Sequence, residues 1–244
     1  MANEGETCDE LRRYGLTICQ PQKGYRFSLD ALLLADFAGS GRENVASLID
    51  LGSGSGVVAL ILARVYTAAD VWGVEKNPDM AALATENVMR NRLAERVRII
   101  AADVLQHKTV SPVSCFDLVV SNPPFRTSRE GRLSTVAGRD VARHESSAGL
   151  ADFLAAAKYL VKPGGSICFV YHPSRLGELM HVAHTLKLAP VRLRLVHDTC
   201  AAPATMFLVE LAKASRAGLT VERPLMVRQD DGRYSPEVAA ILGI

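Results

Sequence analysis

The chain has 244 residues, of which 48% are hydrophobic, enough to bury the core of one sizeable α/β domain. Its formal net charge is +2, so no global field indicates nucleic acid, and any basic binding surface must be local. The five cysteines form no C-x-x-C pair, which argues against a zinc site and against a secreted disulfide framework. Without a signal peptide or a membrane-spanning apolar run, we expect a cytoplasmic protein with no membrane segment and no metal.

Residues 1–46 are expected to form an arm rather than a domain. Residues 16–19 are strand-like, and residues 28–37 read as a helix with Ser28 as its N-cap and an apolar face that must be buried. This helix could simply pack on the main domain, or it could act as a lid over a cofactor. Three residues near its start are the candidates for that second role: Tyr25, Phe27 and Asp30.

Residues 47–244 alternate between apolar strands and amphipathic helices, which predicts a mostly parallel sheet covered on both faces. The expected strands are 47–51, 71–75, 97–101, 116–121, 166–171, 191–196 and 206–211. The expected helices are 57–66, 78–90, 151–160 and 174–186. The last two strands are joined by a connection too short for a helical crossover and should pair antiparallel. The fold class is therefore α/β, a Rossmann-like doubly wound sheet of six parallel strands and one reversed strand.

A glycine-rich loop follows the first of these strands, in the sequence Asp50-Leu51-Gly52-Ser53-Gly54-Ser55-Gly56. Its three glycines let the backbone turn tightly and approach a ligand, and the next helix offers free amide donors at its N-terminus. The second strand ends at Glu75, where a carboxylate can accept both hydroxyls of a ribose. The pattern indicates a nucleotide-like cofactor.

The third and fourth strands carry further polar groups at the same edge of the sheet. Asp103 could accept a hydrogen bond from an adenine amine, and Val104 could flank the ring. The fourth strand runs into Asn122-Pro123-Pro124-Phe125, where tandem prolines force the backbone out of the sheet. The Asn side chain and a Pro carbonyl can both accept from one flat –NH2 group, with the aromatic ring against its plane. We call this arrangement of two acceptors and a ring a clamp for an exocyclic or amide nitrogen. Asn-Pro is also common in ordinary turns, so a plain strand-to-loop turn is the alternative interpretation.

In this order, the glycine loop, Glu75, Asp103 and the Asn-Pro-Pro-Phe motif resemble class I S-adenosylmethionine-dependent methyltransferases that modify a planar nitrogen. Residues 20–30, 142–145 and 231–238 resemble the bacterial methyltransferases of the valine tRNA adenine-N6 group, which methylate the adenine beside the anticodon. The resemblance implies S-adenosylmethionine as the cofactor, tRNA as the partner, and catalysis by the Asn-Pro-Pro-Phe motif. The cofactor-binding residues that it implies are Tyr25, Phe27, Asp30, Asp50, Gly52, Gly54, Gly56, Glu75, Lys76, Asn77, Asp103, Val104 and Asn122.

A long arginine-rich connection follows the clamp and lacks an apolar period. A solvated loop would also be charged, but an excess of arginine beside a nitrogen clamp suits phosphate contact and stacking on extruded bases. Arg192 and Arg194 could extend such a patch, or could mark an edge strand protected from aggregation. The candidate substrate-binding residues are Phe125, Arg126, Arg129, Arg143 and His144.

Other functions stay open from the sequence. A nicotinamide dinucleotide would require the third glycine at Val57 and would give the Asn-Pro-Pro-Phe motif no role. The clamp would also suit the exocyclic amine of guanine in ribosomal RNA or a glutamine amide in a protein. The glutamine-modifying enzymes usually carry a substantial N-terminal helical domain, for which this arm is too short. An RNA-binding scaffold with a methyltransferase fold is the non-enzymatic alternative.

Overall fold

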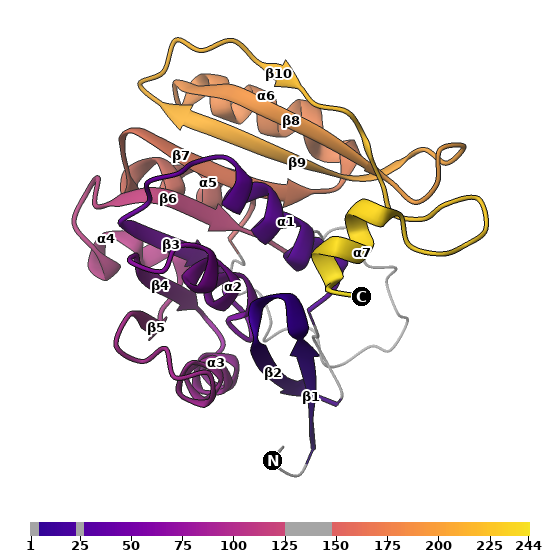
Figure 1. The fold of residues 1–244 in the computed structure, drawn as a ribbon. Coiled ribbons are helices and arrows are strands. Elements are labelled where there is room, and N and C mark those ends of the chain that lie inside the picture. Colours follow the sequence, from indigo (N-terminus) through magenta and orange to yellow (C-terminus); the bar gives the residue numbers. More distant parts are fainter. Residues whose placement is uncertain (1–4, 23–26, 125–147) are drawn as a thin grey trace, which may run out of the picture.

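The structure is a computed structural model, which describes residues 5–22, 27–124 and 148–244. One large twisted sheet crosses the molecule, in the order β10-β8-β9-β7-β6-β3-β4-β5, with β11 also paired to β8 (Figure 1). Its strands are β3 (Ser47–Leu51), β4 (Asp70–Glu75), β5 (Val97–Ala101), β6 (Phe116–Ser121), β7 (Val161–Tyr171), β8 (Leu188–His197), β9 (Ala204–Lys213), β10 (Thr220–Val221) and β11 (Leu225–Met226).

The mixed α/β fold with a mostly parallel sheet is as predicted. Strands β3 to β7 run parallel to one another, and β9 pairs antiparallel with both β7 and β8. The strands β10 and β11 were not predicted, because a strand of two residues has no alternation for a sequence pattern to reveal. Both add to the β8 edge in the parallel direction.

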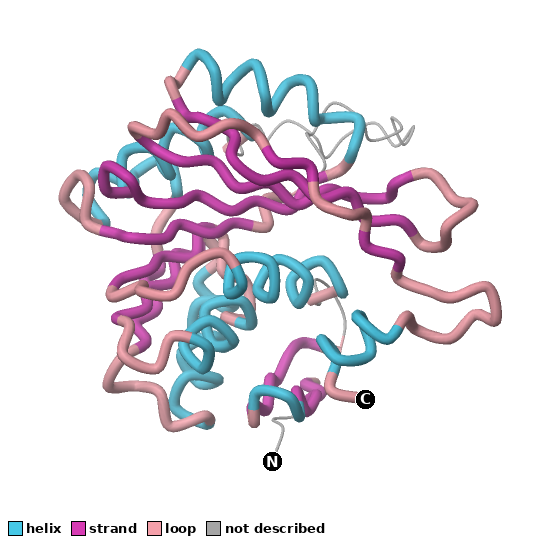
Figure 2. Tube along the Cα trace, turned by 45° about the horizontal axis from the view of Figure 1, so that its top comes forward, coloured by secondary structure: helices cyan, strands magenta, loops and turns pink. Residues whose placement is uncertain are grey.

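Helices cover both faces of this sheet (Figure 2). Buried residues of α1, α2 and α7 form one core with one face, and α5 and α6 form a second core with the other. The helix bounds are α1 (Leu29–Ser40), α2 (Val57–Val65), α3 (Pro78–Arg90), α4 (His107–Val110), α5 (Leu150–Leu160), α6 (Leu176–Thr185) and α7 (Pro236–Leu242), with short 3-10 turns at Arg12–Tyr14, Val104–Gln106 and Pro173–Arg175. None of the helices in the described ranges has the length and apolar character needed to cross a membrane.

A hairpin precedes α1 and forms its own two-stranded sheet from β1 (Glu6–Leu11) and β2 (Leu16–Pro21). The strand β1 was missed because its sequence, Glu-Thr-Cys-Asp-Glu-Leu, lacks a clear apolar alternation. The register places Cys8 directly opposite Cys19, and a disulfide joins them. The scattered cysteines had predicted no disulfide framework, but strand pairing brings together two residues that the sequence separates.

At its N-terminus, α1 departs from the predicted cap. Ser28 occupies the N-cap position but makes no capping hydrogen bond with its side chain. Instead its hydroxyl donates to Oδ1 of Asp30 at 2.7 Å. The hydroxyl thus orients the Asp30 carboxylate, which is a candidate site residue.

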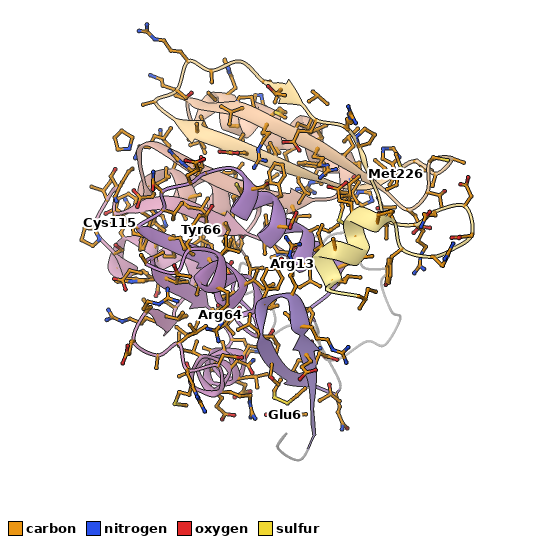
Figure 3. All side chains as sticks on the ribbon, viewed as in Figure 1. Glu6, Arg13, Arg64, Tyr66, Cys115 and Met226 are labelled. Carbon is orange, nitrogen blue, oxygen red and sulfur yellow. A yellow bond between two sulfur atoms is a disulfide. The ribbon has the colours of Figure 1, made fainter. Side chains whose placement is uncertain are left out.

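The C-terminal end of α1 is attached to the sheet by buried polar contacts. Nε of Arg192 donates to Oε2 of Glu210 at 2.9 Å, and Ser166 donates to the other oxygen of this carboxylate. The Arg192 guanidinium also donates to the carbonyl of Phe37 in α1 and lies 3.9 Å from the centre of its ring. Tyr66, labelled in Figure 3, donates to the nearby carbonyl of Ala38 at 3.0 Å.

Neither Arg192 nor Arg194 therefore extends an open basic patch. Arg194 is paired with Glu237 of α7 at 2.7 Å, so its charge holds the C-terminal helix against β8. The alternative, an edge strand protected from aggregation, does not describe them either, because β10 and β11 pair with β8 and both arginines form ion pairs within the protein.

The buried carboxylate of Glu210 should matter far more for stability than the exposed carboxylate of Glu237. Glu210 is 7% exposed, and its removal leaves the Arg192 charge buried with one partner fewer. We expect Glu210→Ala to lower the free energy of unfolding by about 3 kcal/mol. Glu237→Ala, at a side chain 50% exposed, is the matched control and should lower it by less than about 1 kcal/mol. Urea denaturation, monitored by circular dichroism, measures the free energy of unfolding of each variant. Equal losses in the two variants would contradict the larger contribution of the buried Glu210 carboxylate.

Candidate cofactor and acceptor site

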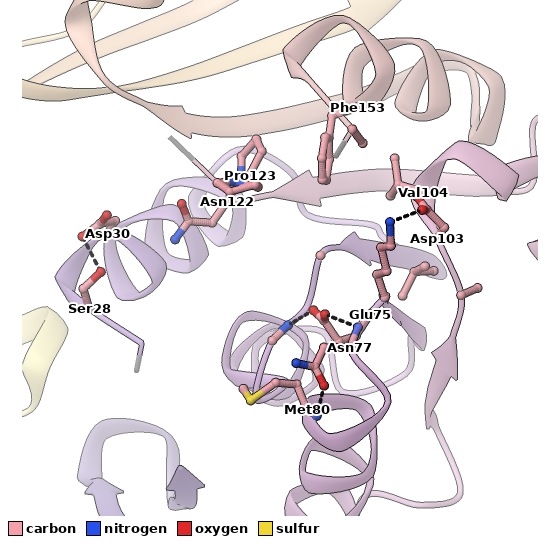
Figure 4. Close-up of a pocket in the computed structure, with 17 residues that line it drawn as sticks. Ser28, Asp30, Glu75, Asn77, Met80, Asp103, Val104, Asn122, Pro123 and Phe153 are labelled. Carbon is pink, nitrogen blue, oxygen red and sulfur yellow. Dashed lines mark hydrogen bonds and ion pairs between the residues drawn. The ribbon is translucent and has the colours of Figure 1, made fainter. Parts of the chain in front are cut away.

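The strand register brings the predicted site residues to one level of the sheet. Leu51 of β3 lies opposite Val74 of β4 and Ser121 of β6, and Glu75 lies opposite Ala101 of β5. The residues that follow these strand ends therefore project from the same edge, where ligands bind in open α/β sheets. A cavity of about 500 Å³ lies there (Figure 4).

Most of the predicted residues line this cavity. They are Asp30, Gly52, Gly54, Glu75, Lys76, Asn77, Asp103, Val104, Asn122, Pro123 and Pro124. Phe27 and Asp50 line a small adjoining cavity, which also touches Gly52 and Asn122. Gly56 lines neither cavity and instead begins α2 as its N-cap. Tyr25, Phe125, Arg126, Arg129, Arg143 and His144 lie outside the described residues.

The sequence analysis missed several lining residues, namely Ser28, Val74, Met80, Ala102, Ala148 and Phe153. Phe153 is the most informative of them, because it comes from α5, on a different part of the chain from the glycine loop. A Cβ added to Gly52 would lie 3.5 Å from its ring, so the ring packs directly on the loop. Met80, in the first turn of α3, could have been found from its place just after the Glu75 strand end.

The glycine loop adopts a conformation that other residues would resist. Gly52, Gly54 and Gly56 have φ angles of 75°, 54° and 82°, in the left-handed region. The N–H of Gly54 donates to Oε2 of Glu75 at 2.8 Å, and the N–H of Asn77 donates to Oε1 at 2.8 Å. Each carboxylate oxygen has a further lone pair, so Glu75 is held in place and can still accept from two vicinal hydroxyls.

At the end of the neighbouring strand β5, Asp103 forms an ion pair with Lys76, with Nζ and Oδ2 2.9 Å apart. Its other oxygen accepts from the N–H of Leu105 at 2.9 Å. Burial would raise the pKa of Asp103, but the hydrogen bonds from Lys76 and Leu105 and the Lys76 charge outweigh it and lower the pKa. Asp103 is therefore an ionised acceptor, and an adenine amine would share it with Lys76.

Asp50 is almost completely buried, at 1% exposure, and its Oδ2 has no hydrogen-bond partner among the described residues. The hydroxyls of Ser53 and Ser55 are likewise buried, with no partner in the part of the chain that the structure describes. Burial, followed by the charge of Glu75, raises the pKa of Asp50 to about 7, although a hydrogen bond from the Ala59 backbone opposes this. Buried polar groups nearly always have a hydrogen-bond partner, so these atoms indicate that a bound ligand donates to them. Together with Asp30, Asp50 therefore fits the cationic amino-acid end of S-adenosylmethionine, and Glu75 and Asp103 fit its nucleoside end.

The acceptor clamp stands opposite the Glu75 side of the cavity. The Asn122 side chain points toward Asp30, and Pro123 follows it along the cavity wall (Figure 4). Tyr171, at the end of β7, donates through its hydroxyl to the carbonyl of Pro124 at 3.4 Å. Beneath the clamp, the buried Ser121 hydroxyl donates to the carbonyl of Leu51 at 2.6 Å, which joins β6 to the glycine-loop strand. Across the parts of the chain that the structure describes, no cluster of His, Cys, Asp and Glu side chains could hold a metal ion.

Comparison with known proteins identifies the family of this chain. Residues 30–181 match the model of the methyltransferase small domain family. A tRNA1(Val) (adenine(37)-N6)-methyltransferase of Porphyromonas gingivalis is 31% identical over 224 residues, covering 87% of this chain and 85% of the relative. An enzyme of the same name from Yersinia enterocolitica is 32% identical, covering 82% and 78% of the two chains.

Solved structures show the same fold at lower identity. The crystal structure of a protein described as a predicted O-methyltransferase from Agrobacterium tumefaciens superposes with a TM-score of 0.71 and 22% identity, covering 88% of this chain and 95% of the other. A Thermus thermophilus 16S rRNA N2 methyltransferase in complex with AdoMet and guanosine gives a TM-score of 0.57 and 21% identity, covering 85% and 50%.

The chain belongs to the methyltransferase small domain family. Membership in this family implies S-adenosylmethionine as the methyl donor, which agrees with the acids and glycines around the cavity and leaves the nicotinamide alternative without support.

The raised pKa of Asp50 gives a pH-dependent test. A carboxyl whose folded pKa lies near 7, above its ordinary 3.8, binds its proton more tightly in the folded state, so stability falls as pH rises between these values. Asp50→Asn lacks this effect. The free energy of unfolding of the variant minus that of wild type should rise by on the order of 3 kcal/mol from about pH 4 to about pH 8.

Urea unfolding of the ligand-free protein across this range measures the difference. The same variant should bind S-adenosylhomocysteine more weakly, because an amide cannot balance an ammonium charge. A difference in unfolding free energy that stays constant with pH would refute the raised pKa of Asp50.

Proposed function

We propose that the protein transfers a methyl group from S-adenosylmethionine to the exocyclic N6 of an adenine in tRNA, beside the anticodon of valine tRNA. The observation that carries the proposal is the position of Asn122 and Pro123 on the same cavity as Glu75 and Asp103. The residues that would hold the acceptor nitrogen and those that would bind the nucleoside of the cofactor therefore line the same cavity. The names of the relatives support the choice of adenine and of tRNA.

The exocyclic amine of adenine is a weak nucleophile because its lone pair is delocalised into the ring. The Asn122 side chain and the Pro123 carbonyl would accept its two hydrogens and favour a pyramidal nitrogen whose lone pair is free. When bound, the cofactor supplies an electrophilic methyl group on a sulfonium. Holding the amine in line with that methyl group lowers the barrier through orientation.

The same acceptors stabilise the positive charge that develops on nitrogen in the transition state. No strong general base is required, because the proton becomes acidic once the nitrogen has been methylated. The adenine must leave its stack to reach a clamp at the sheet edge, and an anticodon loop offers bases in an accessible state.

Asn122→Ala should abolish methyl transfer while leaving cofactor affinity near that of wild type. It removes the side-chain acceptor that orients the amine, which acts on the transition state rather than on cofactor binding. We expect the rate to fall by at least about a hundredfold. Isothermal titration with S-adenosylhomocysteine measures affinity, and tritium transfer measures the rate. Glu75→Gln is the contrasting variant and should weaken cofactor binding. Wild-type turnover by Asn122→Ala would rule out the clamp mechanism.

The substrate is tested by tritium transfer from labelled S-adenosylmethionine to total tRNA, ribosomal RNA and soluble protein from cells that lack the gene, followed by nucleoside analysis. We expect label as N6-methyladenosine in one tRNA. A methylated guanine in ribosomal RNA, or label in protein, would keep the clamp and overturn the substrate. Cofactor binding without transfer to any of these would favour the scaffold alternative.

A further inference from the structure

The outer edge of β2 is completed by a helix rather than by a third strand. β1 pairs with one edge of β2, and α3 packs beside β2 (Figure 1). The backbone groups of a strand edge need partners, and an unpaired buried edge would be unstable. The partners here are two asparagine side chains, one in α3 and one at its C-cap.

Asn87 lies in α3, and Asn91 is the C-cap of this helix. Because they are four residues apart, their side chains lie on the same side of it. Asn91 accepts from the N–H of Thr17 at 2.8 Å and donates to the carbonyl of Thr17 at 2.8 Å. Asn87 likewise accepts from the N–H of Cys19 at 2.9 Å and donates to the carbonyl of Cys19 at 2.8 Å. Each side-chain amide therefore reproduces the two hydrogen bonds of a neighbouring strand, and both asparagines are buried.

The two asparagines differ in where their remaining hydrogen goes. Asn91 donates it to the carbonyl of Asn87, within its own helix. Asn87 donates it to the carbonyl of Ser55, at 3.0 Å. Ser55 lies between Gly54 and Gly56, whose positive φ angles shape the glycine loop. Of the two, Asn87 alone connects the hairpin with that loop.

The hairpin also contacts the opposite wall of the site. Gln20, next to Cys19 in β2 and 2% exposed, accepts the backbone N–H of Phe27 at 3.0 Å. Phe27 is followed by Ser28 and then by Asp30, both of which line the cavity. Two neighbouring residues of β2 are thus connected to both walls: Cys19 reaches the glycine loop through Asn87, and Gln20 binds the segment that leads into α1.

We propose that Asn87 is a positioning residue that fixes the glycine loop in its ligand-binding shape, with the N-terminal hairpin as its support. The proposal rests on the proposed use of S-adenosylmethionine. By holding the Ser55 carbonyl, Asn87 orients the peptide plane that joins Ser55 to Gly56, whose rotation glycine by itself would leave free. The Gly54 N–H that anchors Glu75 belongs to the same loop.

The test compares Asn87→Ala with Asn91→Ala, the matched control one helical turn away. Both variants lose two hydrogen bonds to the hairpin, but only the first frees the Ser55 carbonyl. Isothermal titration of each full-length protein with S-adenosylhomocysteine should show about a tenfold loss of affinity for Asn87→Ala and less than about threefold for Asn91→Ala. Equal losses in two folded variants, or no loss in Asn87→Ala, would overturn the proposal.

Hydrogen exchange of the ligand-free proteins supplies a readout that general destabilisation would not produce. Both variants should exchange faster in the hairpin, whereas only Asn87→Ala should exchange faster in residues 52–56. If Asn87→Ala does not fold, Asn87→Ser and Asn91→Ser give the same contrast, because a hydroxyl keeps a small polar group at each position without burying a charge and cannot span both of the original partners. Failure of the wild type to bind S-adenosylhomocysteine would contradict the proposed cofactor, a result distinct from failure of the asparagine contrast.

Discussion

Parallel backbone pairing of β6, β3, β4 and β5 is the constraint on which the site depends. Each strand brings only one or two polar groups, and those groups are far apart in the chain. Because the pairs Leu51–Ser121, Leu51–Val74 and Glu75–Ala101 are in register, the chain leaves these strands at one level. A shift of the strand register by one residue would turn the strand-end side chains toward the other face of the sheet, and they would no longer line one cavity.

The polar groups at this edge are arranged for binding rather than for stability. Asp50 is buried near the Glu75 carboxylate, and one of its oxygens has no partner within residues 5–22, 27–124 and 148–244, which is unfavourable in a protein without its ligand. Glu75, by contrast, is held by two backbone N–H groups, so its charge is oriented before any ligand arrives. Such preorganisation reduces the reordering that binding requires. The tandem prolines after Asn122 act in the same way on the acceptor side, since their fixed φ angles limit how far the clamp can relax.

Polar contacts away from the cavity hold the N-terminal segment in place. The hairpin is joined to α3 through two asparagines, and α1 is joined to the sheet through Arg192 and Glu210. Both junctions are buried, where an unmatched polar group is costly and a fully matched one fixes a single arrangement. The walls of the cavity therefore derive their positions from residues that do not themselves line it.

The sequence by itself determined the strands at 47–51, 97–101 and 116–121 and the helix at 78–90, because the spacing of apolar residues, glycine and proline acts over a few neighbouring residues. It also placed Asp50, Glu75, Asp103 and Asn122 at strand ends. Only the tertiary structure decided that Phe153 covers Gly52, that Cys8 meets Cys19, and that Arg192 pairs with Glu210 instead of facing a ligand. These contacts join residues distant along the chain, and their partners are chosen by the packing of whole elements, which no local pattern encodes.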